Sequence, residues 1–124
     1  MGFFNKFNKG ERVFDIDLAE VPFITLAELA REKGTKAIHK VVALYVNDKG
    51  LYKPHPIAVC IIDGGEIVQV DLPEHLTETV EDIIEDDTAV NLIKSGKCGI
   101  IARSYTTDKY PNKTFYSALF VDIE

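Results

Sequence analysis

Five apolar runs of β-type composition, interrupted once by a helical pattern, constrain the fold of this chain more than any other feature. The runs are residues 37–46, 57–62, 67–72, 98–105 and 115–122. Turn sequences at 47–50 (AsnAspLysGly) and 63–66 (AspGlyGlyGlu) separate the first three runs and are typical of links between antiparallel strands. Pro54 and Pro56 lack backbone donors, so we expect an edge or a bend where the second strand begins.

The helical pattern lies between the third and fourth runs, and its two faces differ in charge. The apolar face is formed by Leu76, Val80, Ile83 and Ile84, at the i, i+4, i+7, i+8 spacing. The opposite face carries Glu74, Glu78, Glu81, Asp82 and Glu85. Pro73 is expected to open this helix, with Asp71 as a cap. Residues 86–89 predict a second short helix, which Ser95 and Gly96 end.

Two further elements precede the first run. Residues 12–18 alternate in character and predict a short strand. A helix is expected to follow, because Thr25 and Glu28 form a capping-box pattern and Gly34 suits the position after the last turn. Residues 1–11 are expected to be a flexible N-terminus.

The order strand, strand, strand, helix, strand, strand is that of the OB-fold, a five-stranded Greek-key barrel. We therefore expect one OB-like domain over residues 12–124, mostly β with α additions. Residues 36–124 would form the barrel, with the acidic helix plugging one end. Residues 12–35 would be a strand–helix addition packed outside it. The main competitor is an α+β sheet with its helices on one side.

The net charge of −6 conceals an uneven distribution of charge. Residues 63–87 contain ten acidic and no basic side chains, so the rest of the chain has 14 basic and 10 acidic residues. Residues 31–60 have six basic residues against two acids, and residues 88–121 have five against one. A basic face away from the acidic segment is therefore compatible with the overall negative charge.

The cysteines and histidines predict neither a disulfide nor a metal site. Cys60 and Cys98 lie in apolar strand-like runs, which favours two buried thiols in a reducing compartment. The three histidines, His39, His55 and His75, have no ligand-like spacing. No apolar run is long enough to span a membrane and the first residues do not form a signal peptide, so we expect a cytoplasmic protein.

The motifs of common enzyme classes do not occur in this sequence. It has no Gly-rich phosphate loop and no GxSxG elbow. Ser95, Ser104 and Ser117 have no histidine near them in the sequence, and Asp15 with Asp17 is best read as a solvent-facing strand edge. We therefore expect no enzyme activity and no cofactor.

Binding of single-stranded nucleic acid has stronger support, because it needs cations for phosphates and flat rings for unstacked bases. Two predicted loops interleave these residue types. The residues expected to bind are Lys49, Tyr52 and Lys53 in the first loop region, and Arg103, Tyr105, Lys109, Tyr110, Lys113 and Tyr116 around the second. Arg103 and Tyr105 should point the same way, whereas Phe115 and Phe120 should lie on opposite strand faces.

Four stretches resemble small proteins of bacterial prophages and conjugative elements. They are residues 43–50, 70–87, 93–99 and 115–124. This group is similar to phage single-stranded DNA-binding proteins, and the resemblance implies an OB-like fold and partners in replication or recombination. The chain has no tryptophan, so base stacking would depend on Tyr and Phe.

Two hypotheses follow. The first is sequence-tolerant binding of single-stranded DNA in phage or mobile-element replication or recombination. The alternative is a protein-interaction domain of a mobile element that acts through the acidic helix, residues 74–87, without affinity for nucleic acid. A homodimer or higher homo-oligomer is compatible with either hypothesis, since exposed strand edges can pair, and Phe3, Phe4 and Phe7 are candidate contacts.

Overall fold

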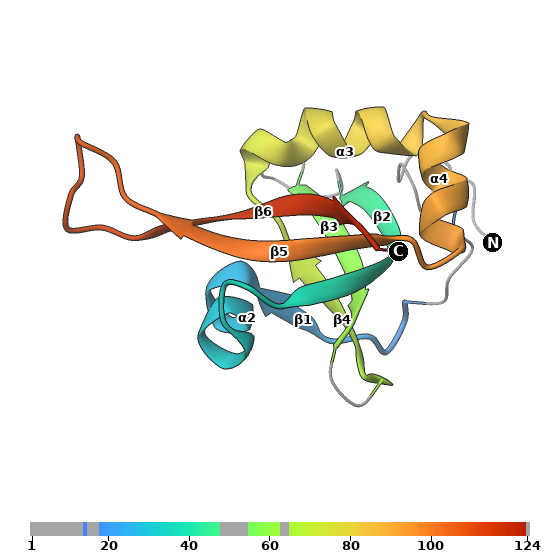
Figure 1. Cartoon of the computed structure of the whole chain (residues 1–124), viewed down its shortest axis with the longest axis horizontal. Helices are drawn as coiled ribbons and strands as arrows, with labels where there is room; N and C mark the ends of the chain where they lie inside the picture. Colours follow the sequence, from blue (N-terminus) through green and yellow to red (C-terminus); the bar gives the residue numbers. More distant parts are fainter. Residues whose placement is uncertain (1–13, 15–17, 48–54, 63–64, 124) are drawn as a thin grey trace.

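The computed structural model describes residue 14 and residues 18–47, 55–62 and 65–123, which form a curled mixed sheet with short helices around it (Figure 1). The strands are β1 (Phe23–Thr25), β2 (Ile38–Asn47), β3 (His55–Ile61), β4 (Ile67–Asp71), β5 (Cys98–Tyr105) and β6 (Phe115–Asp122). The helices are α2 (Leu26–Lys33), the 3-10 turn η3 (Glu74–Leu76), α3 (Thr77–Ile84) and α4 (Asp87–Lys94).

The strand order β1-β4-β3-β2-β5-β6 confirms the five predicted strands but differs from a five-stranded barrel. Four of the five neighbouring pairs are antiparallel, and β1 pairs with β4 in parallel. Closing the strands β4-β3-β2-β5-β6 into a barrel would require β4 to pair with β6. The edge of β4 that would face β6 in a barrel pairs with β1 instead, so in the described chain the sheet is open.

Strand β1 belongs to the sheet, whereas the segment that contains it, residues 12–35, was expected to pack outside a barrel. Most of the strand predicted over residues 12–18 lies outside the described residues. The predicted helix is confirmed: Thr25 Oγ1 accepts a hydrogen bond of 3.1 Å from the Glu28 backbone N–H, and Gly34 ends the helix with φ at +86°. Helix α2 follows β1 but also contacts β5 and β6, so it bridges the two ends of the curled sheet.

Pro56 does not lie on an edge strand, which was one of the two arrangements expected where the second strand begins. It lies near the start of β3, a central strand, opposite Val46 of β2. A proline is compatible with this position because its carbonyl still accepts a 3.0 Å hydrogen bond, from the Leu72 backbone N–H. Pro54 lies outside the described residues.

The segment after β4 forms helices with one apolar side, as predicted. Val80 is fully buried, and Leu76, Ile83 and Ile84 pack against the core. The expected cap at Asp71 was wrong, because Pro73 occupies the position before η3 and no side chain caps it. Asp86 does cap α4, accepting a 3.0 Å hydrogen bond from the Ala89 backbone N–H.

The core extends over both faces of the central strands, where every residue of β3 from Pro56 to Cys60 is buried. Buried Tyr45 donates a hydrogen bond to the Gln69 side-chain oxygen. The Gln69 amide nitrogen donates in turn to the Val21 carbonyl at 3.1 Å, which links β4 to the segment before β1.

Both cysteines are free thiols. The register places Cys60 opposite Val41 of β2, and Cys98 lies on β5 at the other side of β2. Two strand spacings of about 4.8 Å therefore separate them, which exceeds the reach of a disulfide. Among the described residues, no helix has both the length and the apolar character needed to span a membrane.

Candidate nucleic-acid interface

The β5–β6 hairpin forms an arm that extends beyond the body of the molecule (Figure 1). Its register is unbroken over eight residue pairs, from Cys98 opposite Asp122 at the foot to Tyr105 opposite Phe115 near the tip. The aromatic residues of both runs, together with Ile100, Ile101 and Val121, favour strands at these positions. The arm presents its tip away from the core, where it can meet a partner.

Two consecutive turns build the tip. The Tyr110 backbone N–H donates to the Thr107 carbonyl at 3.2 Å and to Thr107 Oγ1 at 3.1 Å. The Lys113 backbone N–H then donates to the Tyr110 carbonyl at 3.2 Å. Pro111 occupies the second position of this second turn, where its fixed φ is favoured.

Three rings and two lysines gather at this tip. The rings of Tyr105 and Phe115 are stacked, with centroids 5.6 Å apart and planes at 22°. The ring of Tyr110 lies 6.3 Å from that of Phe115 at 58°. Lys109 Nζ lies 5.4 Å from the Tyr110 ring centroid, and Lys113 Nζ lies 5.1 Å from that of Phe115. These cation–π contacts hold positive charge beside flat apolar surface.

The two faces of the arm have different roles. Arg103 and Tyr105 share one face of β5, as predicted, and both are exposed. Phe120 packs against the core on the opposite face, which confirms that it and Phe115 point to different sides. Tyr116 also packs against the core, so the structure separates it from the ring cluster although the sequence placed it among the binding residues.

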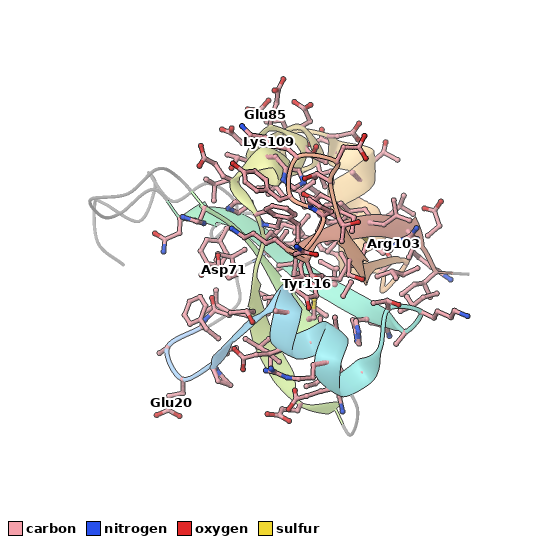
Figure 2. The ribbon with its side chains drawn as sticks, turned by 90° about the vertical axis from the view of Figure 1, so that its left-hand side faces the viewer. Glu20, Asp71, Glu85, Arg103, Lys109 and Tyr116 are labelled. Carbon is pink, nitrogen blue, oxygen red and sulfur yellow. The ribbon has the colours of Figure 1, made fainter. Side chains whose placement is uncertain are left out.

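The charge of the arm is positive in an otherwise acidic protein. Arg103, Lys109 and Lys113 are exposed, and the only carboxylate from residue 99 to residue 121 is that of Asp108. In Figure 2, which looks along the arm, Glu85 of the helical segment and Arg103 of the arm project from different sides of the molecule. The first predicted loop group, Lys49, Tyr52 and Lys53, lies outside the described residues.

The structure brings together one pair that sequence reasoning missed. His75 Nε2 of η3 lies 3.0 Å from Ser117 Oγ of β6, within hydrogen-bonding distance. Ser117 is directly opposite Arg103, so this contact connects the helical segment to the middle of the arm. The two residues are 42 positions apart, and no local sequence pattern indicates such a contact.

The thiols do not contribute reactive groups. Burial raises the pKa of the Cys60 thiol well above its ordinary range, and the charge of Cys98 nearby raises it further. Burial, followed by the Asp122 carboxylate, raises the pKa of Cys98. Both therefore stay protonated near neutral pH, and a thiol is a poor nucleophile and metal ligand. In the described part of the chain, no three His, Cys, Asp or Glu side chains are grouped so as to hold a metal ion.

Comparison with known proteins adds no relative: no family model, no curated protein and no solved structure matches this chain.

Proposed function

We propose that this protein binds single-stranded nucleic acid, DNA in the first instance, with the tip of the β5–β6 arm. The observation that carries the proposal is the cluster of Tyr105, Tyr110 and Phe115 with Lys109 and Lys113 on one protruding, exposed element. Stacking surfaces combined with cations are what an unpaired strand requires. A role in replication or recombination of a phage or mobile element is the biological context that we propose for it.

The open ring faces define how a strand would bind. Tyr105 and Tyr110 are 43% and 49% exposed, so each ring has accessible surface on which a base can stack. Lys109, Lys113 and Arg103 would then contact phosphates. Every base has a flat face, so binding through these groups tolerates sequence. Bases inside a duplex are already stacked, so duplex DNA should bind more weakly.

The test is a titration of fluorescently labelled oligothymidine with the full chain, followed by anisotropy at low and moderate salt. We expect binding that weakens as salt increases and exceeds the binding of a duplex of the same length. An absence of binding at tens of micromolar protein in low salt would rule out the proposal.

The acidic face of the helical segment supports the second candidate, a site for a basic protein partner. Glu74, Glu78, Asp82 and Glu85 are all exposed, and none of them contributes to the core. Changing Glu78 and Asp82 to lysine separates the two candidates. The first predicts that the wild type and this variant both bind oligothymidine, whereas the second predicts that neither binds it and that the variant loses its protein partner.

A further inference from the structure

One face of the arm carries large apolar side chains at its tip and again toward its foot. Ile101 lies opposite Leu119 of β6 and opposite Ile38 of β2, so the three side chains form one row across three strands. Side chains alternate along a strand, so Ile101 shares its face with Arg103 and Tyr105. The pair of Arg103 and Ser117 lies between this row and the ring cluster at the tip.

This row is exposed, while the other face of the same strands is core. Ile38 and Leu119 keep 54% and 47% of their surface exposed. Ile100 and Ala102, on the opposite face of β5, are fully buried. Large apolar side chains that lie exposed and adjacent to one another mark a contact surface rather than scattered surface residues.

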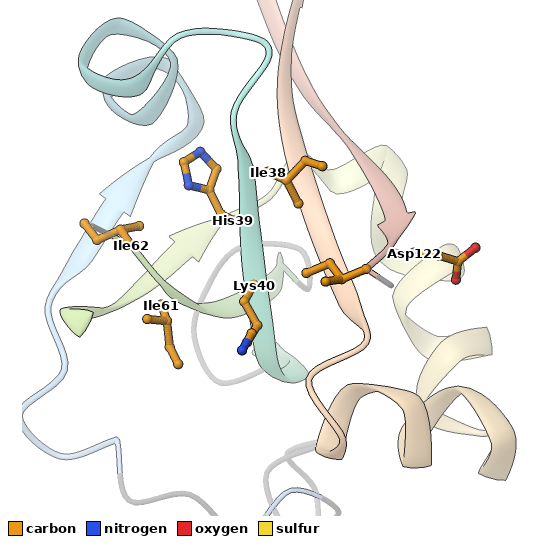
Figure 3. Close-up of a pocket in the computed structure, with 7 residues that line it drawn as sticks. Ile38, His39, Lys40, Ile61, Ile62 and Asp122 are labelled. Carbon is orange, nitrogen blue, oxygen red and sulfur yellow. The ribbon is translucent and has the colours of Figure 1, made fainter. Parts of the chain in front are cut away.

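The row ends at an open hollow at the foot of the arm. Its volume is about 610 Å³, and Ile38, Lys40, Ile61 and Ile123 contribute to its wall. Figure 3 shows Ile38 and Ile61 on either side of Lys40, with the Asp122 carboxylate directed away from Ile61. The volume lies within the range of about 300–1,000 Å³ that small-ligand sites occupy.

The face is long enough for several nucleotides. From Gly99, which pairs with Lys40, to Tyr105 there are six residue steps. At about 3.4 Å per step this is roughly 20 Å. Each strand of B-DNA advances about 3.4 Å per nucleotide, so about six nucleotides stacked in the same way fit between foot and tip.

We propose that the single strand continues from the tip of the arm along this face and places a base in the hollow at the foot. The inference rests on the proposed function. Lys40 at the foot and Arg103 midway are exposed cations that would contact phosphates. If a second copy of the chain docked with the same face, Lys40 and Arg103 of the two copies would come close together and repel one another. Phosphates would neutralise these cations, so the charge of the face favours a nucleic-acid strand as its occupant.

The experiment compares two oligothymidines by anisotropy, one of about 4 nucleotides that covers the tip alone and one of about 12 that covers the whole face. The variants are Ile38→Ser and Lys40→Glu. Their matched controls are Phe23→Ser, an exposed apolar residue on the edge strand β1, and Lys94→Glu, an exposed lysine on α4. Tyr110→Ala measures the contribution of the tip to binding of each oligonucleotide. Thermal melting of each variant shows that it is folded.

We expect Ile38→Ser and Lys40→Glu each to bind the long oligonucleotide about five- to tenfold more weakly and the short one unchanged. Tyr110→Ala should weaken both, and the controls should bind both like the wild type. If both foot variants bind the long strand normally while Tyr110→Ala does not, the extended track is wrong and the tip site stands.

Two other outcomes also overturn the inference, for different reasons. If the wild type binds neither length, the proposed function fails with it. If Ile38→Ser reduces self-association in sedimentation velocity without changing DNA binding, the apolar row is a contact between copies of the chain.

Discussion

Tyr105 and Phe115 are direct cross-strand partners in the last register pair of the β5–β6 arm, and their rings stack 5.6 Å apart at 22°. This pair ends the ladder of the hairpin with an aromatic contact and gives the tip a rigid apolar surface. Tyr110 and the two lysines then pack on this base. The candidate interface is therefore organised before any ligand binds, which reduces the entropy lost on binding.

Removing the Tyr110 ring should weaken single-strand binding without affecting the fold. Tyr110→Ala is expected to reduce affinity for oligothymidine by about 1–3 kcal/mol, the contribution of one base stacked on an aromatic ring. The residue is half exposed, so the free energy of unfolding should change by no more than about 0.5 kcal/mol. Anisotropy and urea denaturation measure the two quantities. Normal affinity in this variant would remove Tyr110 from the site.

Neutralising the two lysines of the tip should change the salt dependence of binding. In the variant with Lys109→Gln and Lys113→Gln, the slope of log affinity against log salt should become shallower by about 1.4, since each phosphate contact on a single strand contributes about 0.7. The loss should be similar for oligonucleotides of different sequence. A double variant of Lys33 and Lys94, on α2 and α4, is the control and should keep the wild-type slope.

Gly99 should not tolerate a side chain. A Cβ atom there would lie 2.6 Å from Ile38 Cγ2, 3.0 Å from Ile123 Cδ1 and 3.1 Å from the His39 carbonyl oxygen. The side chains can move, but the carbonyl belongs to the neighbouring strand and cannot move without distorting it. Gly99→Ala is expected to lower the free energy of unfolding by about 1–3 kcal/mol. Ser104→Ala, at an exposed position of the same strand, should have little effect, and equal melting of the two variants would contradict this expectation.

The buried thiol of Cys60 should make stability depend on alkaline pH. Its pKa is raised in the folded state, so the protonated thiol contributes stability fully below the ordinary pKa of 9.0. Above that pH the unfolded chain loses the proton first, and stability falls as pH rises. Urea denaturation from pH 8 to about 10.5 should show this decline, and Cys60→Ala should show a smaller one. A decline of the same size in both proteins would assign it to other groups.

Much of the local structure could be predicted from the sequence. The bounds of β5 and β6 agree with the predicted runs, the Thr25 cap and the Gly34 stop occur as expected, and a short helix follows Asp86 as predicted. Strand alternation and capping depend on residues one to four positions apart, so the pattern along the chain is sufficient to define them. The rings and lysines of the arm could also be identified from the sequence, because they lie close together along the chain.

Tertiary structure decided which segments meet. Whether β4 pairs with β6 or with β1 depends on competition between strand edges, and the three-residue β1 carries too little pattern to predict its pairing. The contact of His75 with Ser117 and the inward direction of Tyr116 likewise depend on how the sheet curls. Local periodicity determined the elements of this protein and the chemistry that the arm carries. Packing between segments distant in sequence determined the open sheet, the exposed face of the arm and the hollow at its foot, because burial and edge pairing are properties of the whole chain.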